Sequence, residues 1–159
     1  MRTETAKLFD HVLPKVRGNE YAGSMIREAT TSDISKIRSL MQTVPGFWQQ
    51  WWCDATIAAA IESAHGLAFV WEERSLILGF VCVHDLGFRA YLSELVVDDS
   101  VRNQGIATRL VRAVEEVLTG RGQQVLIADV WHEAEPFYKS LGWERPDAML
   151  LRQRLKTDD

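Results

Sequence analysis

Apolar residues recur every three to four positions in three segments of the chain, and this spacing predicts three amphipathic helices. The first follows Thr30 and Asp33, which are spaced as a capping box. The second begins near Asp54 and stops at Gly66, and the third, the longest, runs to Gly120. The positions expected to be buried are Ile34, Ile37, Leu40 and Met41 in the first helix, Ile57, Ala60, Ile61 and Ala64 in the second, and Ile106, Leu110, Val111, Val114, Val117 and Leu118 in the third.

Between the second and third helices the pattern becomes that of strands. Segments 67–72, 76–84 and 89–97 are apolar and are separated by short polar or glycine-containing turns, which predicts antiparallel hairpins. The remaining elements are expected to be strands at 24–29, 124–130 and 149–155 and a short helix at 133–141 closed by Gly142. The order β-α-α-β-β-β-α-β-α-β(β) predicts a mixed α/β (α+β) fold with helices flanking a mostly antiparallel central sheet.

The chain length of 159 residues leaves room for one full domain. We expect this domain at 25–156, preceded by an extension at 1–24 and followed by a tail at 157–159. The extension carries an apolar cluster with helical spacing before Pro14, made of Leu8, Phe9, Val12 and Leu13.

Charge and cysteine content narrow the function classes. With 18 basic and 22 acidic residues the net charge is -4, which argues against the dense basic face that nucleic-acid backbones require. No run approaches the roughly 20 apolar residues of a membrane span. Cys53 and Cys82 lack metal-ligand spacing and do not indicate a disulfide framework, so a reducing cytoplasm is the expected location. The histidines form no ligand set with the acidic residues, and no metal is expected.

A candidate anion-binding loop lies between the strand that ends at Val97 and the third helix. Residues 102–107 read Arg-Asn-Gln-Gly-Ile-Ala. Amide N–H groups at a helix start have no intrahelical partners, the helix dipole adds partial positive charge, and Arg102 adds a full one. Gly105 permits a tight turn or a close ligand approach. The loop therefore favours a diphosphate, while the P-loop and dinucleotide-fold fingerprints are both absent.

Two motifs, in this order, resemble those of the Gcn5-related N-acetyltransferase (GNAT) superfamily. Arg102, Gly105 and Ala107 match its Gln/Arg-x-x-Gly-x-Gly/Ala acyl-coenzyme A loop. Phe-Tyr-Lys-Ser-Leu-Gly-Trp at 137–143 is close to its Phe/Leu-Tyr-x-x-Leu-Gly-Phe signature. The resemblance spans nearly the whole domain and implies a central sheet that splays between two strands. One departure is Trp131, which stands where the family often has Asn.

The resemblance implies that acetyl-coenzyme A is the cosubstrate. The backbone of the splayed strand would pair with the pantetheine arm, the loop would hold the pyrophosphate, and a backbone N–H near Val96 or Val97 would stabilise the oxyanion. The implied cofactor-binding residues are Leu95, Val96, Val97, Arg102, Asn103, Gln104, Gly105, Ile106, Ala107, Thr108 and Tyr138.

Two catalytic roles have candidates. The resemblance places the Tyr138 hydroxyl beside the sulfur, where a phenol with a pKa near 10 can protonate a thiolate, so Tyr138 is the expected general acid. The alternative is that its ring only packs against the cofactor. Glu94, just before the pantetheine segment, is the first candidate for the base. Asp129 is the second, and water can also take the proton from the amine.

Aromatic residues concentrate between the first two helices. Trp48, Trp51 and Trp52 are expected to share a helical face, which fits core packing or a subunit contact. As a hypothesis, Trp48 and Trp51, together with Asp129, bind the acceptor substrate through stacking, cation–π or polar contact. His84, at a strand end, is either a proton shuttle or a hydrogen-bonded turn residue.

The leading hypothesis is an N-acetyltransferase that moves the acetyl group of acetyl-coenzyme A directly to a primary amine of a small molecule or peptide. The alternative is a non-catalytic acyl-coenzyme A sensor or regulatory module, for which Trp131 in place of the family's Asn leaves room. The expected partner is the amine acceptor, with no nucleic acid and no membrane, and a homodimer stays open.

Overall fold

The structure is a computed structural model that describes residues 23–155. The chain divides into two compact units, the first ending at Ala128 and the second beginning at Asp129. The helix expected before Pro14 lies outside the described residues.

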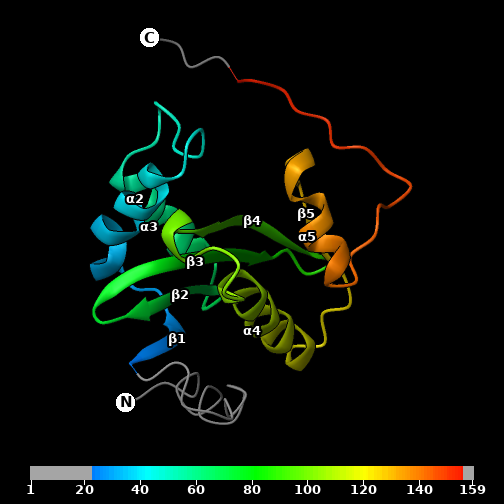
Figure 1. Ribbon diagram of the computed structural model, residues 1–159. Helices are drawn as coiled ribbons and strands as arrows, with labels where there is room; N and C mark the ends of the chain where they lie inside the picture. The colour runs from blue at the N-terminus through cyan, green and yellow to red at the C-terminus, as the bar shows by residue number, and fades with distance from the viewer. Residues whose placement is uncertain (1–22, 156–159) are drawn as a thin grey trace, which may run out of the picture. The chain divides into compact units, whose positions relative to one another are not determined.

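A five-stranded sheet forms the centre of the first unit (Figure 1). Its spatial order follows the chain, and all neighbouring strands are antiparallel except the last pair, which is parallel. This confirms the expected mostly antiparallel sheet. The strands are β1 (Ser24–Glu28), β2 (Ala68–Glu73), β3 (Leu76–Asp85), β4 (Ala90–Val97) and β5 (Leu126–Ala128).

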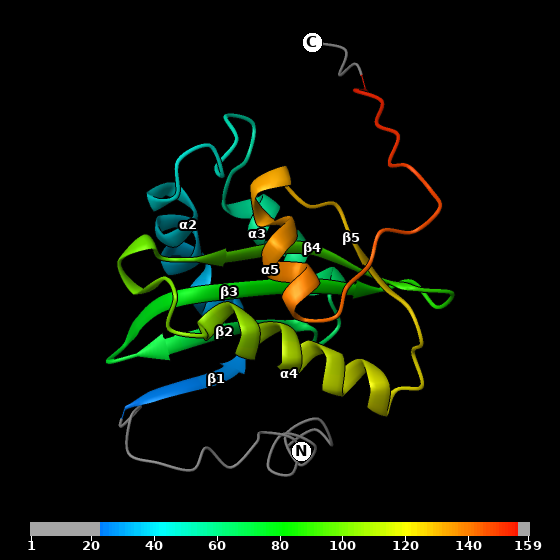
Figure 2. The same cartoon turned by 45° about the vertical axis from the view of Figure 1, so that its right-hand side comes forward.

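Helices cover both faces of this sheet (Figure 2). The α2 and α3 helices lie on one face and the longer α4 helix lies on the other. Every position of the apolar stripe predicted for α4 is buried, because the stripe faces the sheet along the whole helix. The helices are α2 (Ile34–Thr43), α3 (Asp54–Ser63) and α4 (Ile106–Gly120), and single 3-10 turns occur at η2 (Thr31–Asp33) and η3 (Asp99–Val101).

Gly79 of β3 allows α4 to lie close to the sheet. A Cβ at this position would be 2.9 Å from Leu110 Cδ1 and 3.0 Å from Ile106 Cγ2, both closer than normal packing allows. Because Ile106 is the first residue of α4, Gly79 sets how near the start of this helix comes to β3.

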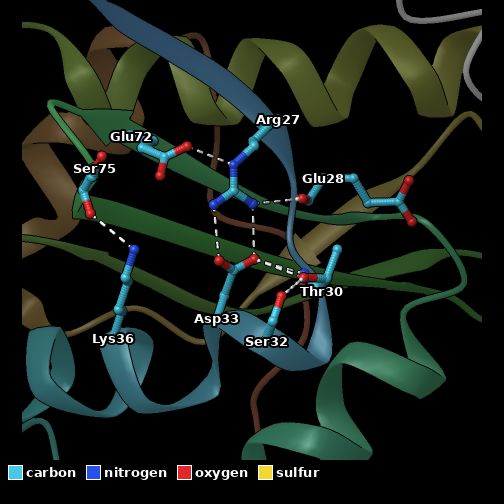
Figure 3. Close-up of polar contacts among 8 residues, drawn as sticks. All are labelled: Arg27, Glu28, Thr30, Ser32, Asp33, Lys36, Glu72 and Ser75. Carbon is cyan, nitrogen blue, oxygen red and sulfur yellow. Dashed lines mark hydrogen bonds and ion pairs between the residues drawn. The ribbon is translucent and has the colours of Figure 1, made fainter.

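An ion network ties β1 and β2 to the start of α2 (Figure 3). The two terminal nitrogens of Arg27 donate to the two carboxylate oxygens of Asp33 at 2.8 Å each, and Nε donates to Glu72 at 2.7 Å. Asp33 also accepts from the backbone N–H of Thr30 at 2.9 Å, which completes the predicted capping box. Asp33 is only 4% exposed, and the hydrogen bonds from Arg27 lower its pKa to about 2.

The second unit contains a 3-10 turn, η4 (His132–Ala134), followed by α5 (Glu135–Ser140). Gly142 has a φ of 92°, a left-handed value that ends the helix as predicted. The backbone N–H of Trp143 then donates to the Tyr138 carbonyl at 3.1 Å. The chain therefore folds back, and the Trp143 ring lies 5.0 Å from the Tyr138 ring.

Two strand predictions were wrong. The final strand expected at 149–155 does not form, and Met149 and Leu155 are 81% and 85% exposed. A strand needs a neighbouring edge as well as apolar residues, and this segment pairs with no described strand. The buried strand expected at 124–130 is reduced to the three residues of β5, because the chain pairs only with the first residues of β4, from Ala90 to Leu92. β5 is also not fully buried.

Candidate active site

A β-bulge in β4 organises the site. Cys82 faces Glu94 and Val83 faces Leu92, so Ser93 is an extra residue on β4 with no partner of its own on β3. An extra residue reverses the alternation of inward and outward backbone groups beyond it. The bulge therefore decides which residues at the end of β4 direct their amides away from β3.

The backbone groups of Leu95 and Val97 point away from β3. The Asp98 N–H donates to the Leu78 carbonyl at 2.9 Å, which fixes the phase of the ladder. Every second residue of an antiparallel pair is hydrogen-bonded to its neighbour, so Val96 directs its backbone groups toward β3 and the residues on either side do not. The cofactor-pairing residues expected at 95–97 are thus two outward residues separated by an inward one.

The outward side of this part of β4 is also open along the sheet. β5 pairs with β4 only from Ala90 to Leu92, where the two strands run parallel. Beyond Leu92, no strand of the described residues pairs with β4 on that side. This is the splay that the sequence resemblance implied, and it leaves two peptide groups at the end of β4 where an extended ligand could pair as an additional strand.

The loop between β4 and α4 has the backbone shape of an anion site. Asn103 and Gly105 have φ values of 62° and 78°, so the chain turns twice through the left-handed region before α4 begins. Gly105 is the N-cap of α4 and makes no side-chain hydrogen bond to the first turn. A Cβ on Gly105 would meet no atom within 4 Å, so the space beside the loop is open.

The side chains of this segment differ in what they can contribute. Asn103 and Gln104 are exposed, and Ala107 and Thr108 are half-buried. The Ile106 side chain is in the core and can offer a ligand only its backbone N–H. Arg102 is exposed and pairs with Asp99 at 2.6 Å, a surface ion pair that is weak enough to exchange for an incoming anion. The open amides, the small Ala107 side chain and the arginine fit a diphosphate.

Glu94 lies on the sheet face covered by α2 and α3. It is opposite Cys82 and directly follows the bulge residue Ser93, and it is half-buried. The candidate base is therefore carried by the same strand as the two outward amides, but its side chain is directed to a face of the sheet rather than along the strand edge.

Tyr138 and Asp129 both belong to the second unit. The Tyr138 ring is packed edge-on between Phe137, at 5.1 Å, and Trp143, at 5.0 Å. Burial, with a smaller contribution from the charge of Asp129, raises the pKa of Tyr138 to about 12. The phenol is therefore protonated throughout the physiological pH range. Asp129 itself is exposed.

The expectation of a shared helical face for the tryptophans was wrong. No helix forms between α2 and α3, because the chain turns at Pro45-Gly46 and Gly46 has a φ of 77°. Trp48 and Trp52 instead pack edge to face with ring centres 5.7 Å apart, whereas Trp51 is 67% exposed. The two tryptophans expected to bind the acceptor therefore have different environments.

Sequence reasoning did not identify Ser93 as part of the site. The bulge that it forms depends on the register between β3 and β4, and no local pattern of residues marks that register. Cys82, although its spacing suggested no role, contributes to a hydrogen-bonded cluster on the same face as Glu94.

The mixed sheet that splays beyond Leu92 and the glycine-capped start of α4 are the features that the resemblance to the GNAT superfamily implied. A model of the family described as "Acetyltransferase (GNAT) family" matches residues 32–143. The chain belongs to this family.

Solved structures share the fold at low sequence identity. The PaiA N-acetyltransferase of Thermoplasma acidophilum, solved in complex with coenzyme A, has a TM-score of 0.70 and 15% identity, covering 80% of this chain and 94% of that chain. The ribosomal-protein-S18-alanine N-acetyltransferase of Escherichia coli has a TM-score of 0.66 and 23% identity, covering 75% and 76%. Glucosamine-6-phosphate N-acetyltransferase of Arabidopsis thaliana has a TM-score of 0.66 and 18% identity, covering 83% and 99%.

No curated protein matches the chain in sequence. Within residues 23–155, no group of histidine, cysteine and acidic side chains is arranged to hold a metal ion. None of the helices in this described part combines the length and the apolar character needed to cross a membrane.

Proposed function

We propose that this protein is an N-acetyltransferase that transfers the acetyl group of acetyl-coenzyme A directly to a primary amine of a small molecule or a peptide. The observation that carries the proposal is the continuity between the open edge of β4 and the glycine-capped start of α4. An extended, amide-containing arm that ends in a diphosphate would find peptide groups for the arm and helix-start amides for the phosphates on one continuous stretch of chain.

Each part of this stretch has its own task in binding. Leu95 and Val97 would pair their outward backbone groups with the amides of the pantetheine arm. The loop would hold the diphosphate through the backbone N–H groups at the start of α4, and Arg102 would exchange its contact with Asp99 for a phosphate. Acetyl-coenzyme A supplies a thioester whose carbonyl carbon accepts the amine.

The reaction removes protons from the acceptor amine and adds one to the leaving thiolate, and each transfer needs a donor or an acceptor. An acceptor that arrives as an ammonium ion loses one proton before its nitrogen can attack, and Glu94 would take that proton directly or through water. The nitrogen–carbon bond then forms and the carbon–sulfur bond breaks, while whichever of the two outward N–H groups of β4 the pantetheine arm does not use stabilises the carbonyl oxygen. The second amine proton leaves, the thiolate gains one, and one proton in total passes to solvent.

Tyr138 would supply the proton to the thiolate. Burial keeps its phenol protonated, so the proton is present at every working pH. The same burial makes complete transfer to a thiol with a pKa of about 8.5 unfavourable by roughly 3.5 pKa units. We therefore infer that Tyr138 acts first as a hydrogen-bond donor to the developing thiolate, and that it recovers its own proton quickly.

The acceptor proposed is a primary amine of a small molecule or a peptide. Two of the similar structures are named for their acceptors, an alanine of ribosomal protein S18 and glucosamine-6-phosphate. The aromatic rings of Trp48 and Trp51 in the first unit, and separately the carboxylate of Asp129 in the second, are groups of the kinds that suit a cationic acceptor. Cys53 and Cys82 are both free thiols, which fits the reducing cytoplasm expected from the sequence.

Thiol release from acetyl-coenzyme A, measured against a panel of peptide, aminoglycoside, amino sugar and polyamine acceptors, tests this function. We expect turnover with at least one acceptor and a loss of about 100-fold in kcat for Tyr138→Phe, the usual scale for a proton donor. Tyr91→Phe, on β4, is the matched control and should retain activity. Tight coenzyme binding without turnover on any acceptor would contradict the enzyme proposal and support a non-catalytic sensor instead.

A further inference from the structure

His84 of β3 is surrounded by hydroxyl and thiol groups on the sheet face that also carries Glu94. Its Nε2 lies 2.9 Å from Ser93 Oγ and 3.6 Å from Cys82 Sγ. Its Nδ1 lies 3.2 Å from Ser63 Oγ, at the end of α3. Both ring nitrogens are therefore held, one by the bulge of β4 and the other by a helix on the opposite side of the ring.

Each of the two serine hydroxyls can donate its own proton to a backbone carbonyl. Ser93 Oγ donates to the Cys82 carbonyl at 3.3 Å, and Ser63 Oγ donates to the Ala60 carbonyl at 3.2 Å. When the two hydroxyls point this way, their lone pairs face the ring, and both ring nitrogens can carry a proton. When one hydroxyl rotates toward the ring, it donates to a neutral imidazole. The cluster can thus hold either charge state of His84 with small rotations.

The cluster also connects two different environments. Ser93 directly precedes Glu94, the candidate base, and His84 and Ser93 are both half-buried. Ser63, at the other end, is exposed. The hydrogen bonds thus run from the strand that carries the candidate base to solvent at the end of α3.

We propose that His84, with Ser93 and Ser63, forms a proton outlet that carries the proton of an incoming ammonium acceptor from the Glu94 side of β4 to solvent. The proposal rests on the acetyl transfer proposed above, in which one proton per turnover must reach solvent. His84 and Ser93 act as relay groups and do not form a bond to the acetyl group.

The relay passes one proton from the acceptor side to solvent and then returns to its starting state. Neutral His84, with its proton on Nδ1, accepts the hydroxyl proton of Ser93 at Nε2, while Ser93 takes the proton that Glu94 or water has removed from the ammonium. The imidazolium then loses its Nδ1 proton through Ser63 to water. Exchange with solvent returns the ring and the two hydroxyls to their starting arrangement.

The other titratable groups around the ring come from three elements. Cys82 lies on β3, and burial raises the pKa of its thiol to about 12, so it stays protonated and forms no thiolate–imidazolium pair. On β4, Tyr91 is opposite His84 and Glu94 is opposite Cys82. On α3, the last turn carries Glu62 beside Ser63. Of these, Glu94 is the acidic group on the same sheet face.

The pH profile of acetyl transfer, measured with an acceptor that the wild type turns over, tests the outlet. His84→Gln can keep a hydrogen bond to Ser93 but cannot gain a proton. We expect it to lower kcat/KM about tenfold, less than the loss of a sole general base because water substitutes in part, and to remove one ionisation from the acidic limb. Coenzyme A affinity, measured by calorimetry, should be unchanged. His65→Asn, in the turn after α3, is the matched histidine control.

Ser93→Ala provides a second test that leaves the histidine in place. If both residues act in one relay, the double variant should be no slower than the slower single variant. A wild-type pH profile and rate in His84→Gln would overturn the outlet while leaving the transferase intact. A parallel loss of rate, coenzyme affinity and thermal stability would show a structural role and would also overturn it. Absence of wild-type turnover on any acceptor would overturn the transferase and the outlet together.

Discussion

The starts of α2 and α4 are built in opposite ways. Before α2, Thr30 and Asp33 cap the chain with their own side chains, and Arg27 neutralises the carboxylate. Before α4, the cap is Gly105, which has no side chain to offer. A helix start that carries its own anion is complete in itself, whereas one capped by glycine keeps its amides available for an anion from outside. The same local physics thus gives a structural contact at the start of α2 and, as we propose, an anion-binding site at the start of α4.

Giving α4 the kind of cap that α2 has should cause the largest effect. Gly105→Asp introduces a carboxylate where the diphosphate would bind, and we expect coenzyme A affinity to fall about 100-fold, or roughly 2.7 kcal/mol. Calorimetric titration measures this loss. Gly122→Asp is a closely matched control, because Gly122 has a φ of 80° and open space but follows the other end of α4. Equal losses of affinity in both variants would contradict the role of the loop.

Removing the carboxylate at the α2 start should affect stability rather than binding. Asp33→Asn leaves Arg27 without its bidentate partner, and we expect the free energy of unfolding to fall by about 2 kcal/mol. Urea unfolding measures this change, and coenzyme A affinity should stay the same. Asp99→Asn breaks the exposed pair with Arg102 and should cost about 0.5 kcal/mol or less. If Asp33→Asn weakened coenzyme binding, the two helix starts would not be independent.

The same network should make stability depend on pH in the acidic range. The folded-state pKa of Asp33, about 2, lies below its ordinary value of 3.8, so its contribution is complete above the ordinary value and is lost as the pH falls toward 2. Between about pH 6 and about pH 3 the wild type should lose roughly 1 kcal/mol through this group. Urea unfolding at both pH values should show a smaller loss of unfolding free energy for Asp33→Asn than for the wild type. Identical losses would show that Asp33 is not the source of the pH dependence.

Displacing α4 from the sheet should produce a smaller effect on stability than removing the Asp33 carboxylate. Gly79→Ala places a methyl group against Leu110 and Ile106, and we expect overpacking to lower the free energy of unfolding by about 1 kcal/mol. The start of α4 would shift slightly, so coenzyme A affinity should fall only a few-fold. Thermal unfolding and calorimetry report the two effects. A gain in stability would contradict the close packing of α4 against Gly79.

The sequence was informative where structure follows from local periodicity. The buried stripe of α4 and the capping box at Asp33 depend on residues three or four positions apart, and both were predicted. The pair between Arg27 and Glu72 joins residues 45 positions apart, and no local sequence pattern predicts it. The bulge at Ser93 likewise arises from cross-strand register.

The errors have a related cause. The apolar residues of 149–155 resemble a strand, but a strand exists only where another strand offers its edge. The tryptophans between α2 and α3 have helical spacing, but the chain from Pro45 to Trp51 forms turns and bends instead of a helix. For the candidate site, the sequence located the loop between β4 and α4, whose cofactor-binding role stays a prediction, while the phase that turns Leu95 and Val97 outward needed the structure.

Amide hydrogen exchange, followed by NMR with and without coenzyme A, tests the central claim most directly. The account predicts that the Leu95 and Val97 amides, together with those at the start of α4, become protected when coenzyme A binds. The Val96 amide, already directed to β3, should be protected in both states. Binding of coenzyme A without added protection at Leu95 and Val97 would contradict the proposed strand-like pairing along β4.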